Sequence, residues 1–396
     1  MTAAACSVPL AQVAALNPRL LNALGDGTPV SFVPMASVSA EEARVTLPVD
    51  RPYAEVRKGY TYFETGDVLV AKITPCFENG KIAQALLPRQ YGFGSTEFHV
   101  VRPTSGKLDG RYLHHFLRQA RIRVEGERRM TGSGGQRRVP EDFLAHLSIP
   151  VPPLPDQRRI AAILDQADAL RARRREALAQ LDSLTQSIFI EMFGDPVTNS
   201  KRWPLVRFAT KLSAPLRNGL SPSSVGKVQA KVLTLAAITG DDFDPSALKL
   251  GTFVSAPPAG QAVDERDFLI CRGNGNMNLV GKGHFPDANM PDVTFPDTMI
   301  AARISRTEIG AAYLQTLWNS RAVRLQIEGL ARTTNGTYKV NQPMLESVLI
   351  ADPPLALQQT FATRIQAVES LKSTHRAALA ELDALFASLQ HRAFTG

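Results

Sequence analysis

The chain has 396 residues and a mass of 43.1 kDa, more than one hydrophobic core usually organises, so two globular units or a repeated unit are expected. Lysine and arginine outnumber aspartate and glutamate by 45 to 37, and the net charge of +8 favours a polyanionic partner without identifying it. The cysteines lie far apart, and no basic leader or membrane-length apolar run is present, so the composition favours a cytoplasmic protein and disfavours disulfide-rich, exported and membrane-spanning classes.

The first 150 residues have the pattern of a mixed α/β domain. Short β-like runs such as Val68–Ile73 and Phe98–Val101 alternate with Gly/Pro turns, and a helical stretch is expected near Arg111–Glu125. Five arginines fall close together in and after this stretch, which indicates a surface that follows phosphates. They are Arg118, Arg121, Arg123, Arg128 and Arg129, of which Arg128 and Arg129 are candidate nucleic-acid contacts.

A glycine-rich basic loop, Gly132-Ser-Gly-Gly-Gln-Arg-Arg-Val139, follows these arginines. Glycine allows the backbone to approach a phosphate closely, and amide groups and cations supply donors. A solvated surface loop can have the same composition, so the loop alone leaves both interpretations open. The candidate nucleic-acid contacts in it are Gln136, Arg137 and Arg138.

A long helix is predicted after the Pro-Pro-Leu of Val151–Leu154. Pro155 suits the first helical position, and Asp156 places a carboxylate in the first turn, where the helix dipole favours it. No Gly or Pro interrupts the chain until Gly194, which gives ~57 Å of helix if the run is unbroken. Apolar residues recur at steps of three and four, as in helices that pack along their length, so a second long helix is needed as a partner.

The second half repeats the first. With an offset of 201 residues, Val139 falls on Val340, Pro152-Pro153 falls on Pro353-Pro354, and Gln157 falls on Gln358. The run that ends in Lys72 aligns with the run that ends in Arg272, with offset 200, and Arg138 aligns with Lys339. We therefore add Lys72, Arg272, Tyr338 and Lys339 to the candidate nucleic-acid contacts, and expect Arg138 and Lys339 to contact phosphates.

The repeat predicts the architecture. The fold class is α/β (α+β), with two globular domains separated by two long helices that form an antiparallel coiled coil, paired about the midpoints Arg174 and His375. The expected domain boundaries are 1–150, 151–196, 197–352 and 353–396. The predicted residues of the seam between the helices are Leu164, Leu170, Leu178, Leu181, Ile365, Leu371, Leu379 and Leu382.

Three other motifs do not predict catalysis. Asp352-Pro-Pro-Leu355 is similar to an amino-methyltransferase motif, but Leu355 replaces its aromatic residue and no glycine fingerprint for a cofactor accompanies it. Gly275–Lys282 does not fit a phosphate-binding P-loop, and the adjacent His114 and His115 lack the spacing of metal ligands. We therefore predict no catalytic residue, no metal and no cofactor.

Several motifs together resemble the specificity subunit of a type I restriction–modification system. They include the paired Pro-Pro-Leu helix starts, Phe193-Gly-Asp-Pro196, Phe32-Val-Pro-Met35, Gly59-Tyr-Thr-Tyr-Phe63, Asp67-Val-Leu-Val-Ala-Lys-Ile-Thr-Pro75 and Gly92-Phe-Gly-Ser-Thr-Glu-Phe98. This resemblance implies two target recognition domains that read a split double-stranded DNA sequence, and two methyltransferase subunits docked on the long helices. Restriction subunits would join for cleavage, and the chemistry would belong to the partners. The alternatives are a stand-alone DNA-modifying methyltransferase and a coiled-coil scaffold that does not bind DNA.

Overall fold

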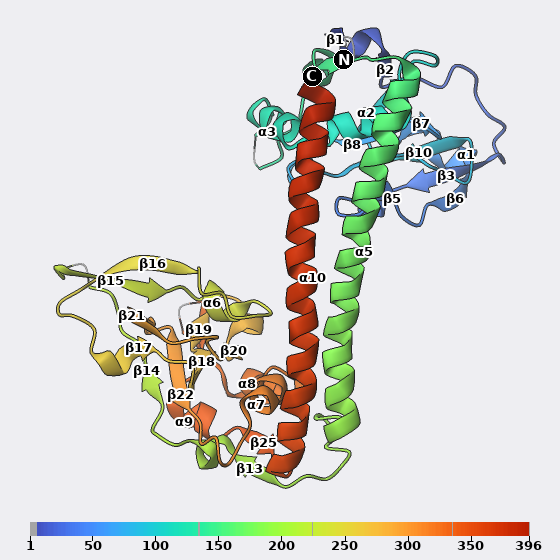
Figure 1. Cartoon of the computed structure of the whole chain (residues 1–396). Helices are drawn as coiled ribbons and strands as arrows, with labels where there is room; N and C mark the ends of the chain where they lie inside the picture. The colour runs from blue at the N-terminus through green and yellow to red at the C-terminus, as the bar shows by residue number, and fades with distance from the viewer. Residues whose placement is uncertain (1–5, 134, 224, 335, 396) are drawn as a thin grey trace. The chain divides into compact units, whose positions relative to one another are not determined.

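The computed structural model describes residues 6–133, 135–223, 225–334 and 336–395. Met1–Ala5 lie outside the described residues, as do Gly134 in the basic loop 132–139 and Asn335 in the loop 333–340 that the repeat aligns with it. The chain divides into two compact units. Unit 1 comprises Met1–Ala177 and His375–Gly396, and unit 2 comprises Leu178–Thr374. Each unit therefore contains one α/β domain and part of each of two long helices, α5 (Leu154–Phe193) and α10 (Leu355–Thr395) (Figure 1).

Unit 1 is built around two sheets and a strand pair. The four-stranded sheet has the order β6 (Val49–Pro52), β3 (Pro29–Val33), β10 (Tyr91–Gly94), β7 (Thr61–Glu64). The six-stranded sheet has the order β2 (Ala14–Leu16), β11 (Phe98–Pro103), β8 (Val68–Ala71), β9 (Ile82–Gln84), β5 (Arg44–Val45), β4 (Val38–Ser39). The remaining elements are the pair β1 (Ser7–Pro9) and β12 (Ser148–Pro150), and the helices α1 (Tyr53–Val56), α2 (Gly110–Leu117), α3 (Ala120–Arg128) and α4 (Glu141–Ala145).

Unit 2 repeats much of this topology. One sheet has the order β16 (Leu248–Phe253), β15 (Val228–Leu233), β21 (Met290–Thr294), β17 (Ala262–Val263), and another has the order β14 (Arg217–Asn218), β22 (Met299–Arg303), β18 (Asp267–Cys271), β20 (Gly283–His284). The pairing of β15 with β21 is parallel, as is that of β3 with β10. The other elements are β13 (Leu205–Arg207) with β25 (Leu349–Ala351), the sheet β19 (Gly273–Asn274), β24 (Thr337–Lys339), β23 (Arg332–Thr334), and the helices α6 (Ala236–Thr239), α7 (Ala311–Trp318), α8 (Arg321–Leu330) and α9 (Gln342–Glu346).

Each domain contains a pair of short helices, and in unit 1 the sequence predicted a single helical stretch at this place. The expected helix near Arg111–Glu125 is divided into α2 and α3, because Gln119 has extended backbone angles (φ −61°, ψ 135°). The corresponding stretch of unit 2 is divided into α7 and α8 at Ser320, with φ −73° and ψ 163°. Residues with such angles cannot continue an α-helix, so each pair turns and covers the core with two short helices.

The ends of the long helices are anchored in the domain cores. In unit 1 the ring of Phe394, at the end of α10, lies 5.0 Å from the ring of Tyr112 on α2. In unit 2 the ring of Phe193, at the end of α5, lies 4.6 Å from that of Tyr313 on α7. All four side chains are buried, and aromatic pairs at these separations add to the stability gained by burial. The end of α10, a helix that begins in unit 2, therefore packs in the core of the unit 1 domain. The end of α5, a helix that begins in unit 1, packs in the core of the unit 2 domain.

The two long helices run antiparallel in each unit, as predicted. In unit 1 the Arg174 guanidinium donates a hydrogen bond to Nδ1 of His375 at 3.2 Å, which confirms the pairing expected for these midpoint residues. Arg171 of α5 also forms an ion pair with Asp383 of α10 at 2.5 Å. In unit 2 Phe189 of α5 packs on Phe361 of α10, with ring centroids 5.6 Å apart.

The seam contains charged residues that the prediction omitted. Positions in steps of three and four form a stripe of unexposed residues on each helix, which we take as the seam: Leu164, Ala167, Arg171, Arg174, Leu178, Leu181, Thr185 and Ile188 on α5, and Phe361, Ile365, Val368, Lys372, His375, Leu379, Leu382 and Phe386 on α10. The predicted Leu170 and Leu371 lie beside this stripe and are 48% and 46% exposed. The prediction from apolar spacing was wrong at these two positions. Arg171 and Lys372 occupy the seam instead, because their aliphatic stems can be buried there while their charged groups form ion pairs with Asp383 and Asp182.

Candidate nucleic-acid interface

In unit 1 two predicted cations lie side by side where a strand leaves the sheet. Lys72 follows β8, and its carbonyl accepts a hydrogen bond from the amide of Val139 at 2.8 Å. Arg138 forms antiparallel bridges with both Ile73 and Thr131. The backbone therefore places Lys72 and Arg138 on neighbouring extended segments, although they are far apart in the sequence.

Unit 2 contains the same arrangement. Arg272 follows β18, and its carbonyl accepts a hydrogen bond from the amide of Val340 at 2.9 Å. The following strand β19 pairs with β24, which sets Gly273 opposite Lys339 and Asn274 opposite Tyr338. The structure thus brings Arg272 together with Tyr338 and Lys339, as it brings Lys72 together with Arg138.

The cations of the two pairs differ in the partners of their side chains. Both Nε and Nη2 of Arg138 donate to the carboxylate of Glu97, at 2.9 and 2.8 Å, and Arg137 lies 3.6 Å from the carboxylate of Glu78. In unit 2, Nη1 of Arg272 donates to the backbone carbonyl of Asp297 at 3.2 Å. Among the described residues, the exposed Lys339 ammonium has no ion-pair or hydrogen-bond partner.

Two titratable groups support the segment that carries Arg138. Its hydrogen bonds hold the pKa of the Glu97 carboxyl below the usual value, so this carboxylate is ionised at neutral pH. Burial lowers the pKa of His99, whose Nε2 lies 2.8 Å from the carbonyl of Val139. A neutral imidazole must donate from Nε2 in this bond, which leaves Nδ1 to accept from the Asn17 amide at 3.3 Å. His99 therefore holds the backbone beside Arg138 without adding charge.

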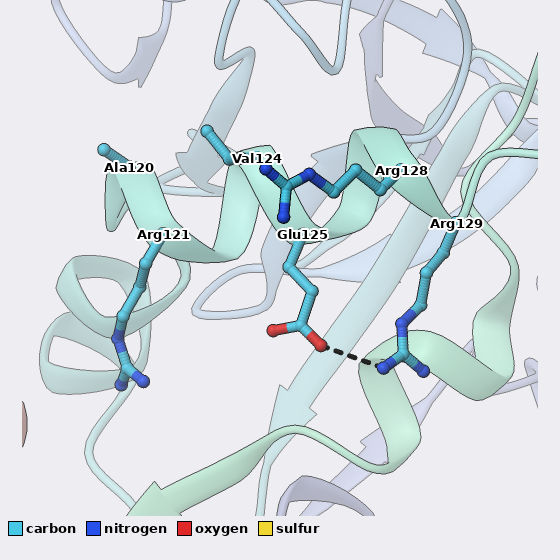
Figure 2. Close-up of a pocket in the computed structure, with 6 residues that line it drawn as sticks. All are labelled: Ala120, Arg121, Val124, Glu125, Arg128 and Arg129. Atoms are coloured by element: carbon cyan, nitrogen blue, oxygen red, sulfur yellow. Dashed lines mark hydrogen bonds and ion pairs between the residues drawn. The ribbon is translucent and has the colours of Figure 1, made fainter.

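A second basic surface lies on α3. Arg121, Val124, Glu125, Arg128 and Arg129 line a surface pocket together with Ala120 (Figure 2). Arg129 forms an ion pair with Glu125 at 3.0 Å, whereas no partner for the Arg128 guanidinium is found among the described residues. Exposed guanidinium groups on one helix face are suited to phosphate contacts.

Not all arginines of this run belong to the surface. Arg118 donates to Asp168 of α5 at 2.6 Å, and both side chains are largely buried, so this pair fastens the domain to the long helix. Sequence clustering cannot separate the two roles, because an arginine used for packing and an arginine used for binding have the same side chain. Gln136 lies exposed in the basic loop, so its side chain is accessible for the predicted contact with nucleic acid.

Sequence reasoning missed a buried ion pair that each domain repeats. Arg102 on β11 donates twice to Asp67, at 2.8 Å in both bonds. In unit 2, Arg303 on β22 donates to Asp267 at 2.8 and 2.9 Å. Both aspartates are almost fully buried, so each arginine balances a carboxylate that would otherwise be costly to desolvate. The repeat offset relates the two pairs and was the available sequence signal.

The Asp-Pro-Pro-Leu motif has a structural role. The Asp352 carboxylate accepts from Nζ of the buried Lys211 at 2.8 Å, and the Pro353 carbonyl accepts from the side-chain amide of Gln358 at 2.8 Å. Within the described part of the chain, no group of three or more His, Cys, Asp or Glu side chains could hold a metal ion. The same residues include no helix long and apolar enough to cross a membrane.

Comparison with protein families and curated proteins finds similarity to DNA specificity proteins. Residues 52–180 match the family described as type I restriction modification DNA specificity domain. The EcoEI specificity subunit of Escherichia coli is 36% identical over 183 residues, which cover 46% of this chain and 31% of that protein. The EcoKI specificity subunit of Escherichia coli K12 is 24% identical over 336 residues, which cover 80% of this chain and 71% of that protein.

The fold has a counterpart among solved structures. A chain from a structure that describes complex assembly and conformational transition of the type I R-M system matches over 98% of this chain and 96% of its own length. The TM-score is 0.55 and the sequence identity is 19%, so this likeness concerns the fold alone. It extends over both α/β domains and both long helices, whereas the family match covers only residues 52–180.

Proposed function

We propose that the chain is the non-catalytic DNA-reading subunit of a type I restriction–modification system, because residues 52–180 match the specificity-domain family and the chain is similar to curated specificity subunits. Each domain would read one part of a bipartite double-stranded target. The observation that carries the proposal is the repeated cation pair, Lys72 with Arg138 in unit 1 and Arg272 with Lys339 in unit 2.

Charge and geometry support DNA as the ligand. Phosphate contacts by Lys and Arg supply most of the sequence-independent affinity of DNA-binding proteins, and base-edge contacts supply specificity. The net charge of +8 and the exposed arginines of α3 serve the first role, while the loops beside the cation pairs carry side chains that can reach base edges. A scaffold that binds only proteins would not need these duplicated basic loops.

The difference between the two domains supports a split target. The strand pairings repeat, but the side chains at equivalent loop positions differ, with Gln136 and Arg137 in one domain and Thr337 and Tyr338 in the other. Two domains of one fold with different contact residues would read two different short sequences, much as paired DNA-binding modules read separate half-sites.

Exposed leucines on the long helices support partner docking. Leu170 and Leu385 belong to unit 1, Leu184 and Leu371 belong to unit 2, and all four, here called the flank leucines, are 44–50% exposed. Each lies one residue before a seam position, so none is needed to hold the helices together. We propose that each pair takes one methyltransferase subunit, that two such subunits bind per chain, and that restriction subunits complete the complex for cleavage, in the cytoplasm.

Methylation mapping tests the proposed function. The chain is co-expressed with its partner methyltransferase subunit in a host that lacks other methylation, and methylated bases are mapped across the genome. We expect one split sequence, with two short defined parts and an unread spacer. A contiguous target, or methyl transfer from labelled donor by the isolated chain, would contradict the proposal.

A further inference from the structure

The two repeats place different cations at the same position, and this difference carries an inference about sequence reading. Arg138 and Lys339 are related by the repeat and lie on equivalent strand segments. Arg138 is held by Glu97 through two hydrogen bonds, whereas Lys339 has no partner among the described residues. A guanidinium fixed by a carboxylate and a free ammonium are suited to different ligands.

We propose that Arg138, oriented by Glu97, reads a guanine in the major groove, and that Lys339 contacts a phosphate. The inference deepens the proposed function and rests on it. Arg138 would be a specificity-determining residue, and Glu97 would be a positioning residue that acts through it.

The hydrogen-bond geometry leaves the reading edge of Arg138 available. A guanidinium has five N–H donors, and Glu97 takes one from Nε and one from Nη2. The remaining donors are on Nη1 and Nη2. Among the described residues, the only further acceptor within reach is the carbonyl of Gln136, at 3.5 Å from Nη1. The pair Nη1 and Nη2 forms the fork that matches the O6 and N7 acceptors of guanine.

Exposure and orientation also fit base reading. The side chain of Arg138 is 41% exposed and that of Glu97 is 25% exposed, so the pair lies at the surface rather than in the core. A guanidinium already held in one orientation loses less conformational freedom on binding than a free arginine would. The carboxylate therefore prepares Arg138 for a ligand that requires a defined geometry.

Charge balance argues against a phosphate as the ligand of Arg138. The Arg138–Glu97 pair has no net charge, so it would release few counterions on binding, and its carboxylate would repel a nearby phosphate. The edge of guanine is neutral and presents two acceptors, so the same carboxylate carries little penalty there. Lys339 carries its charge on a rotatable stem with no partner among the described residues, which suits a phosphate.

The test compares three variants of the whole complex formed with the methyltransferase subunit. Arg138→Lys keeps the positive charge but loses the fork, Glu97→Gln removes the negative charge that orients it, and Lys339→Ala removes the predicted phosphate contact. For each complex the methylated sequence is mapped, and binding to the target and to its single-base variants is measured as a function of salt concentration. Thermal unfolding of each variant chain confirms that it is folded.

The expected results separate the two roles. With Arg138→Lys, one G·C pair in one half of the target becomes degenerate, with discrimination there reduced by about 5- to 150-fold and other positions unchanged. Glu97→Gln weakens discrimination at the same base pair by a smaller factor. Lys339→Ala leaves the sequence unchanged, weakens binding to all variants alike, and lowers the salt slope by about one.

Three outcomes would overturn the inference. Arg138→Lys could methylate the wild-type sequence with unaltered base preference, Arg138→Lys could relax an A·T position, or Lys339→Ala could change the sequence read. Failure of the proposed function is distinct, because the wild-type complex would then show no split target before any variant is compared.

Discussion

At the scale of single residues, two buried glutamines connect the long helices to the domains. In unit 1, Oε1 of Gln157 accepts from the amide of Asp109 at 2.8 Å, and its Nε2 donates to the carbonyls of Lys107 and Pro152 at 2.9 and 2.8 Å. In unit 2, Gln358 accepts from the amide of Gly310 at 2.8 Å in the same way. These bonds tie the start of each long helix to the start of α2 or α7, which explains why the Pro-Pro-Leu and glutamine pattern occurs twice.

Replacement of Gln157 tests this connection. Gln157→Leu removes the hydrogen-bond partner of the Asp109 amide and of the carbonyls of Lys107 and Pro152, and a buried group left unpaired costs about 1–3 kcal/mol. We expect the free energy of unfolding of the chain to fall by at least ~2 kcal/mol, measured as a lower urea midpoint. Gln166→Ala, at an exposed position of the same helix, should change it by no more than ~0.5 kcal/mol. Equal midpoints for Gln157→Leu and the unaltered chain would show that the glutamine is dispensable.

At the scale of elements, repeated ion clusters lie in the seam between the long helices. In unit 1, Arg171 contacts Asp383 of the opposite helix at 2.5 Å and Asp168 of its own helix at 2.7 Å. In unit 2, Lys372 contacts Asp182 of the opposite helix at 2.6 Å and Glu369 of its own helix at 2.8 Å. The repeat relates these residues one to one. Charged groups at seam positions select one register, because a shifted pairing would leave them without partners.

A double-mutant cycle measures the interaction energy between Arg171 and Asp383. Asp383→Ala leaves Arg171 largely buried with only Asp168 as partner, so we expect a loss of about 1–2 kcal/mol, a moderate value because Asp383 is half exposed. Arg171→Met restores an apolar seam residue, and the double variant should be more stable than Asp383→Ala alone. Urea unfolding of the four chains gives the coupling energy. Additive effects would mean that the pair does not act as a unit.

The sequence predicted the helices better than their contacts. The expected run from Asp156 to Phe193 corresponds to α5, Leu154–Phe193, because capping signals and the absence of Gly and Pro are local properties. The seam was displaced because apolar spacing counts Arg171 as an interruption, although its stem packs on Phe386 with its guanidinium 4.4 Å from the ring centre. Glu97 was missed for a related reason, since only the fold brings it beside Arg138.

At the scale of the whole molecule, the repeat gives two sets of equivalent surface residues. The flank leucines occur as equivalent positions, Leu170 with Leu371 and Leu184 with Leu385, and their exposed fractions agree closely at 48% and 46%, and at 44% and 50%. A single exposed leucine is common on protein surfaces, whereas these four recur at equivalent positions of the two repeats. Two equivalent apolar surfaces suit two copies of one partner, which would meet the same residues twice.

Charge substitution of one surface at a time tests the number of partners. A buried glutamate would oppose docking, because its carboxylate must be desolvated where leucine had been favourable. We expect Leu170→Glu with Leu385→Glu to weaken one site by roughly 30-fold, or about 2 kcal/mol, and to reduce the methyltransferase subunits bound per chain from two to one. Leu184→Glu with Leu371→Glu should remove the other subunit, and all four changes together should abolish binding. Native mass spectrometry of the assembled complexes gives the stoichiometry directly.

Leu47→Glu, at a position that is 87% exposed in the unit 1 domain, is the matched control and should keep both subunits. Two bound subunits on either paired variant would assign docking to a different surface of the chain.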